Sequence, residues 1–190
     1  MKKTTLKEYE NLHNEISHKI ETTNSLSTFM ITTVVTILTF AVTQDIPEIY
    51  ILPLCIIIPI SVRIAYYRET IAKISAYIIT FFESDLKELN WETRNCEMMG
   101  ANKIEIIKLC RFSEGFFLSI ICFGLYLNSY IGKNSSVCLC EWQIVISFLF
   151  VLIEGMIVIK INSVDQERLK WCKKWEGIKK TKRKSIANCK

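Results

Sequence analysis

The sequence predicts an all-α integral membrane protein with four transmembrane helices. Four apolar stretches interrupt the chain, in which hydrophobic residues make up 50% of 190 positions. Of the 24 Lys and Arg residues, only Lys133 lies in a loop after the first or the third stretch; Lys160 lies at the end of the fourth stretch, and the others lie before the first stretch, between the second and third, or after the fourth. Cytoplasmic segments of membrane proteins carry such an excess of positive charge. The pattern therefore predicts that both termini and the middle segment are cytoplasmic, while the two short loops face outward.

Each apolar stretch is close to the length that a helix needs to cross a hydrocarbon core of about 30 Å. All four are on the short side, so tilt or neighbouring helices must complete them. The predicted spans are Leu26 to Thr43, Pro47 to Val62, Phe116 to Ile131 and Ile144 to Ile161.

These spans divide the chain into five segments. In the first, the apolar residues Leu6, Tyr9 and Leu12 recur at helical spacing, which predicts an amphipathic cytoplasmic helix. After the second span the helical period continues towards residue 90, and a second helical stretch is expected at 102–112. The segments are a cytoplasmic amphipathic helix (1–25), a transmembrane hairpin (26–62), a cytoplasmic helical region (63–112), a second transmembrane hairpin (113–161), and a cytoplasmic helix with a basic tail (162–190).

The first span carries a continuous stripe of hydroxyl side chains. Residues at steps of three and four share one face of a helix. Such a face can line a water-filled path, because hydroxyls replace part of the hydration of an ion. It can equally pack helices together, since small polar residues are common at contacts between membrane helices. The candidate pore-lining residues of this stripe are Thr28, Thr32, Thr36, Thr39 and Thr43.

Glu154 lies ten residues into the fourth span, near the expected bilayer midplane. An ionisable group at this depth is costly and indicates a functional site by default. The alternatives are a protonated carboxyl bonded to a threonine of the first span, or a pair with Lys160. Together with the hydroxyl stripe, Glu154 favours a polar path, and we expect it to line the pore. Because four short spans are too few to enclose a channel, the pore requires several copies of the chain around a symmetry axis.

Basic and aromatic residues alternate after the second span, a combination that suits phosphates and stacked bases. The competing interpretation is that these residues meet anionic lipid and anchor the membrane interface. The candidate ligand-binding residues are Arg63, Tyr66, Lys73, Tyr77, Trp91 and Arg94. For the basic tail, attraction to anionic lipid is the first interpretation and contact with nucleic acid the second.

The sequence does not favour an enzyme. It contains no nucleophile elbow, phosphate-binding glycine loop, HExxH motif or clustered carboxylates. We therefore expect no catalytic residue, no cofactor and no metal site. Most of the eight cysteines are expected in spans or in reducing cytoplasm. Cys138 and Cys140 face the oxidising side, where two free thiols and a bond between subunits both stay open.

Four helical segments carry a resemblance to known proteins: 9–16 (YENLHNEI), 63–68 (RIAYYR), 71–77 (IAKISAY) and 91–95 (WETRN). Over about its first half, the chain resembles the small transmembrane effectors of bacterial anti-phage defence, in particular the membrane effector of the Hailong type. The resemblance implies an oligomeric ion channel that a nucleotide or oligonucleotide controls and that depolarises the host membrane. It also implies a partner, a nucleotidyltransferase that makes DNA oligomers.

The sequence thus predicts a homo-oligomeric ion channel of the bacterial inner membrane, acting as a defence effector and gated by a nucleotide or oligonucleotide signal. A composition rich in Ile and Lys is typical of AT-rich bacterial genomes. The alternative is a non-conducting membrane scaffold whose cytoplasmic helices recruit a soluble partner.

Overall fold

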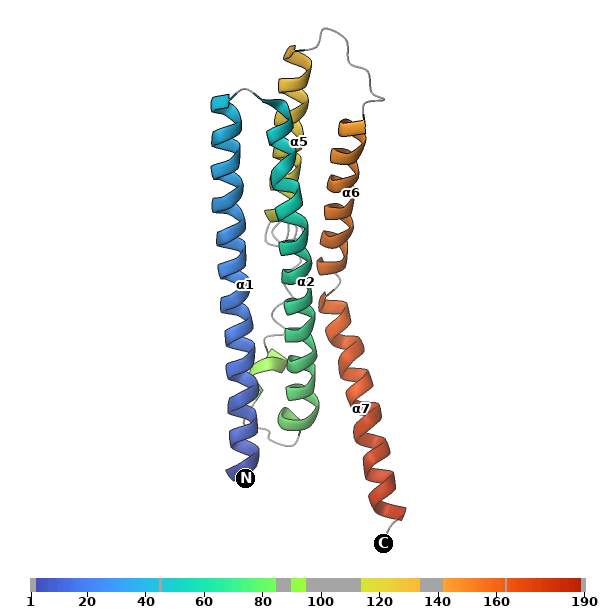
Figure 1. Cartoon of the computed structure of the whole chain (residues 1–190). Coiled ribbons are helices and arrows are strands. Elements are labelled where there is room, and N and C mark those ends of the chain that lie inside the picture. Colours follow the sequence, from blue (N-terminus) through green and yellow to red (C-terminus); the bar gives the residue numbers. More distant parts are fainter. Residues whose placement is uncertain are drawn as a thin grey trace. The chain divides into compact units, whose positions relative to one another are not determined.

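The computed structural model is helical throughout its regular parts. It describes residues 3–44, 46–84, 90–94, 114–133, 142–162 and 164–188, and no strand occurs among them. Figure 1 shows the helices in chain order. They are α1 (Lys3–Gln44), the 3-10 helix η1 (Pro47–Ile51), α2 (Leu52–Ile78), the π-helix η2 (Ile79–Glu83), α5 (Glu114–Lys133), α6 (Trp142–Asn162) and α7 (Val164–Asn188), with a short helical turn at 91–94.

Four of these helical stretches are long and apolar enough to cross a membrane. They are Leu6–Gln44, Pro47–Glu83, Glu114–Gly132 and Trp142–Lys160. The prediction of an all-α chain with four helices able to span a membrane is therefore confirmed for the described residues. The outer loop with Cys138 and Cys140 and the helical stretch expected at 102–112 lie outside the described residues.

Two features of the second span differ from the simple helix that hydrophobicity predicts. The span begins with the 3-10 helix η1, and the α-helix follows only from Leu52. Pro53 thus falls in the first turn of α2, where a missing backbone N–H costs no intrahelical bond. At its other end, α2 passes into the π-helix η2, which ends at Glu83, and residues 85–89, part of the helix expected to run towards residue 90, lie outside the described residues.

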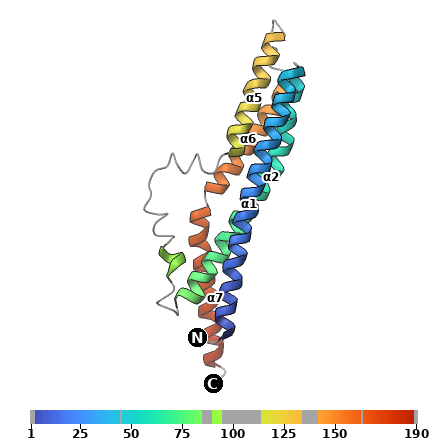
Figure 2. The same cartoon turned by 90° about the vertical axis from the view of Figure 1, so that its left-hand side faces the viewer.

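The chain forms two compact units. Unit 1 comprises Met1–Glu21, Tyr67–Glu105 and Ser163–Lys190, and unit 2 comprises Thr22–Tyr66 and Ile106–Asn162. Unit 2 holds all four predicted spans, and α1 and α2 contribute residues to both units. Within unit 2, α5 and α6 lie beside the corresponding parts of α1 and α2 in both views (Figures 1 and 2).

Unit 2 has two small apolar clusters in its core. One joins Met30 and Val34 of α1 to Leu54 and Ile57 of α2 and to Cys122 of α5. The second joins residues of α1, η1, α5 and α6, namely Ala41, Tyr50, Tyr126, Tyr130 and Ile144. All four helices of unit 2 therefore contribute to one bundle.

The distribution of polarity in unit 2 is the reverse of that in a water-soluble bundle. Its buried residues include Ser61, Ser119, Ser147 and Glu154, whereas many large apolar side chains are exposed. The exposed ones on α1 and α6 include Phe29, Val35, Phe40, Val42, Phe148, Leu149, Leu152 and Met156. Apolar side chains outside and small polar ones between the helices are typical of bundles that have lipid as their solvent. This distribution is typical of a bundle that spans a membrane.

Unit 1 is held together by aromatic side chains. The Tyr77 ring lies against Phe81, Phe82 and Trp175, with centroid distances of 4.7, 5.9 and 5.3 Å. Tyr9 of α1 contacts Phe82 at 5.8 Å. This aromatic cluster joins α1, α2, η2 and α7 within the unit, and such rings contribute both buried area and edge-to-face attraction.

Candidate functional site

The threonines of the predicted stripe form one exposed face of α1. Thr28, Thr32, Thr36, Thr39 and Thr43 are all exposed. At about 100° per residue they lie opposite the buried side of the same helix, which carries Met30, Val34 and Ala41. The structure thus places the stripe on the outer surface of unit 2. We refer to these five residues as the threonine face.

Each hydroxyl of the threonine face donates a hydrogen bond to its own helix. Thr28 donates to the carbonyl of Asn24 (3.1 Å), Thr32 to that of Thr28 (3.0 Å) and Thr36 to that of Thr32 (2.8 Å). Thr39 and Thr43 donate to Val35 and Phe40 in the same way, at 2.9 and 2.8 Å. Because a hydroxyl has one donor and two acceptor lone pairs, the outward side of the face consists of acceptors. Such a surface favours cations or the donor protons of water.

Glu154 lies inside the bundle, in contrast to the exposed threonine face. Its side chain is 1% exposed, and the Ser61 hydroxyl hydrogen-bonds to its carboxyl group. An added Cβ at Gly115 would lie 2.5 Å from the Ser61 Oγ and 3.2 Å from the Glu154 Oε2. Glu154 of α6 therefore meets α2 and α5 at a point of close helix approach. Within one chain the structure does not bring it to the threonine face.

Gly115→Ala is expected to destabilise unit 2 by about 1–3 kcal/mol, because the new methyl group would overlap Ser61 and press on Glu154. Gly124→Ala on the same helix is the matched control, since nothing lies within 4 Å of its added Cβ. That control should be neutral or slightly stabilising, by up to about 1 kcal/mol. Thermal unfolding in detergent, followed by circular dichroism, compares the two. Equal melting temperatures would show that Gly115 is not a close contact.

The six candidate ligand-binding residues divide between the two units. Arg63 and Tyr66 belong to unit 2, where both are exposed, and the other four belong to unit 1. Lys73 is 2.7 Å from Glu69 in an ion pair, and its ammonium lies 4.8 Å from the Trp171 ring centroid. Tyr77 donates its hydroxyl proton to Glu8 (3.1 Å) and its ring belongs to the aromatic cluster. Lys73 and Tyr77 thus take part in the internal packing of unit 1.

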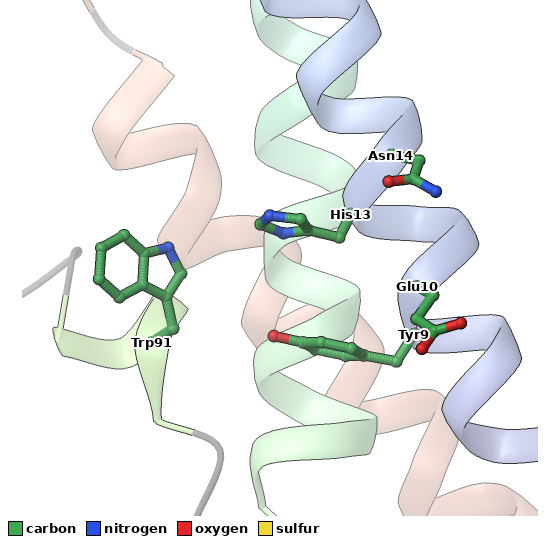
Figure 3. A pocket seen from close by; sticks show the side chains of 5 residues that line it. All are labelled: Tyr9, Glu10, His13, Asn14 and Trp91. Atoms are coloured by element: carbon green, nitrogen blue, oxygen red, sulfur yellow. The ribbon is translucent and has the colours of Figure 1, made fainter.

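Trp91, one of the six candidate ligand-binding residues, lines a cavity. It is 64% exposed and, with Tyr9, Glu10, His13 and Asn14, surrounds about 530 Å³. Figure 3 shows the rings of Tyr9 and His13 projecting from α1 one above the other towards Trp91. The two rings are nearly parallel, with centroids 6.3 Å apart. Among the described residues that line this cavity, Glu10 is the only carboxylate and none is Lys or Arg. Arg94, near Trp91 in sequence, is exposed.

A buried carboxylate network that sequence reasoning missed fixes the helical turn at 91–94. The Glu83 carboxylate accepts the backbone N–H groups of Glu92 (2.7 Å) and Thr93 (2.9 Å) and the Thr93 hydroxyl (2.5 Å). Glu92 in turn accepts the Ser75 hydroxyl at 2.8 Å. Both glutamates are buried. The network therefore positions Trp91, which precedes Glu92 in the chain.

A second cavity of about 540 Å³ lies between η2, the turn at 91–94 and α7. Lys179 of α7 donates to the Thr80 carbonyl (2.9 Å) and the Ser84 hydroxyl (2.6 Å) at this site. Lys180 and Glu176 also line it. The lysine contacts fasten α7 to η2. Within the described part of the chain, no three His, Cys, Asp or Glu side chains are grouped as metal ligands.

Neither a protein-family model, nor a curated protein, nor a solved structure matches this chain.

Proposed function

We propose that the chain is the subunit of a homo-oligomeric ion channel in the bacterial inner membrane, with the threonine face lining the path. The observation that carries this proposal is the exposure of five threonines along one face of α1, in the segment 26–43 whose other exposed residues are apolar. In a closed symmetric ring, every copy presents the same face to the axis. The threonine face then has water or a neighbouring copy beside it in place of lipid.

The residues beside the threonine face fit this arrangement. At about 100° per residue, Phe29 and Phe40 flank it on one side and Val35 and Val42 on the other. All four are large apolar side chains and exposed. Such flanks can pack against the adjacent copy and seal the path from lipid, as close contacts between membrane helices require. Because the hydroxyl protons are used within α1, the path offers acceptor oxygens and favours cations.

The orientation follows from charge. Every Lys and Arg but Lys133 lies outside the outer loops, so the positive-inside bias supports cytoplasmic termini and a cytoplasmic unit 1. Unit 1 then holds the candidate ligand-binding residues Lys73, Tyr77, Trp91 and Arg94. The cavity beside Trp91 supports stacking of a flat ring such as a nucleobase between aromatic side chains.

A signalling role in anti-phage defence, with a nucleotidyltransferase as partner, rests on the resemblance of the first half of the chain. In that role the ligand would change the open probability, and the open channel would depolarise the membrane. A ligand can do so only through different affinities for the open and closed states.

The test is ion flux into liposomes that hold the purified full-length protein, followed with a potential-sensitive dye under a potassium gradient. Flux is expected either with the protein alone or after addition of nucleotides and short oligonucleotides. Empty liposomes serve as the control. Folded protein that passes no ions under any of these conditions would remove the channel and leave the scaffold as the function.

A further inference from the structure

Three helices of unit 2 bring a polar cluster together inside the bundle. Glu154 of α6, Ser61 of α2 and Gly115 of α5 meet there, and Ser119 follows one turn further along α5. Ser119 is fully buried and Ser61 is nearly so. The distances from Gly115 to Ser61 and Glu154 show that the three helices approach closely here. This polar cluster is separate from the threonine face, which lies on the outside of α1.

The hydrogen bonding of the polar cluster is incomplete. Among the described residues, neither the Glu154 Oε1 nor the Ser119 Oγ has a partner, although both atoms are buried. Ser61 supplies one hydroxyl to the carboxyl group. A buried carboxylate is normally satisfied by several donors or by a cation. Glu154 therefore has acceptor capacity that the neighbouring side chains do not fill.

Among the described Lys and Arg side chains of unit 2, none is buried. On α1 the residues 22–44 include no ionisable group. Arg63 of α2 and Lys160 of α6 are exposed, and so is Glu114 of α5, which accepts the Ser27 hydroxyl. Cys122 of α5 and Cys55 of α2 are thiols, one buried and one exposed. An ionised Glu154 would therefore be a bare charge in a bundle that lipid surrounds, at a cost of several kcal/mol.

We propose that Glu154, Ser61 and Ser119 form a proton-binding site inside the bundle, in which one proton neutralises the Glu154 carboxylate. The protonated carboxyl gains an O–H donor while its other oxygen still accepts from Ser61. A metal ion fits less well, because hard cations take about six oxygen ligands and the side chains of the cluster provide four oxygen atoms. The close approach at Gly115 also limits the space.

Because of this site, the packing of α2, α5 and α6 should depend on pH. This dependence is expected whether or not ions pass along the threonine face. Losing the proton would place a charge where α2, α5 and α6 pack most closely. The packed arrangement of these helices is therefore linked to the occupancy of the site. Proton binding and helix packing should change together as the pH rises.

Infrared difference spectroscopy of the full-length protein in lipid tests this proposal without any measurement of flux. We expect the C=O stretching band of a protonated carboxyl at neutral pH, a shift of that band in D2O, and its loss in Glu154→Gln. Glu114→Gln is the matched control, because its carboxyl is exposed at the start of α5, and the band should persist there. Glutamine preserves the size and neutrality of the protonated side chain, so Glu154→Gln is expected to fold.

Two results would overturn the proposal. The first is a folded wild-type protein with no protonated-carboxyl band that depends on Glu154. The second is a band that appears only when sodium is replaced by N-methylglucamine, which would assign the site to a sodium ion. A further expected result is that the wild type, but not Glu154→Gln, loses thermal stability between neutral and alkaline pH in detergent. Equal pH profiles of the two proteins would also contradict the linkage.

Discussion

Replacing Thr32 and Thr36 together with valine is expected to reduce ion flux about tenfold or more. Valine has nearly the shape of threonine, so the helix and its packing are kept while two acceptor oxygens per subunit are lost. If each hydroxyl contributes about 1 kcal/mol to an ion in the path, the two losses exceed the 1.4 kcal/mol that corresponds to a tenfold change in rate. The measurement is the initial rate of the potential-sensitive dye signal in liposomes, normalised to the amount of protein inserted.

Thr33→Val is the matched control for this double variant. It makes the same chemical change on the same helix, but Thr33 is half-buried and lies outside the threonine face. Its flux should equal that of the wild type. A double variant with unchanged flux would remove α1 from the path, even if the protein conducts. A loss of flux that is equal in Thr33→Val would point to a general effect on α1.

Periodicity alone was sufficient to predict the threonine face as a unit. Hydroxyl residues at steps of three and four must share one side of any helix, whatever surrounds it. Which way that side points depends on how α1 packs, and this follows from the pairing of Met30 and Val34 with Leu54 and Ile57. The sequence therefore predicted the stripe, while its exposure required the three-dimensional structure.

For Glu154, the sequence predicts a functional carboxyl group but not the residues around it. Its depth in the fourth span indicated a functional carboxyl, but not which helices face it. On α5, Gly115 lies beside Glu154 and Ser119 follows one turn further on, and a membrane helix with small residues one turn apart is a signal for close packing. The spacing of Gly115 and Ser119 can be read from the sequence, but it does not identify the helix that packs against them. Ser61 as the hydroxyl next to Glu154 could be found only from the packed bundle.

The hydrogen bonds that Glu83 accepts could not be predicted from the sequence, for a different reason. Glu83 ends the π-helix η2, and its partners Glu92 and Thr93 lie in a separate short turn at 91–94. Contacts between a helix end and a short turn leave no repeating pattern. Acidic side chains are rarely buried unless they are paired or hydrogen-bonded, and Glu83 is buried with these hydrogen bonds.

Glu83→Ala is expected to destabilise unit 1 by about 2–4 kcal/mol, because hydrogen bonds to a charged group contribute about 1.5–3 kcal/mol each and their loss leaves buried donors. The backbone N–H groups of Glu92 and Thr93 would lose their common acceptor. The turn at 91–94 should then open while the helices of unit 2 stay folded. Amide hydrogen exchange read by mass spectrometry measures this directly, as faster exchange in a peptide covering residues 90–94.

Two variants make this measurement specific. Glu83→Gln keeps one acceptor oxygen and should lose about half of the protection of the turn. Glu15→Ala removes an exposed carboxylate of the same unit that does not line the cavity beside Trp91 and should leave exchange unchanged. Since Trp91 directly precedes Glu92, the fluorescence of this tryptophan is expected to change in Glu83→Ala and to stay the same in Glu15→Ala. Unchanged exchange in Glu83→Ala would mean that the turn is held by its other contacts, above all that of Glu92 with Ser75.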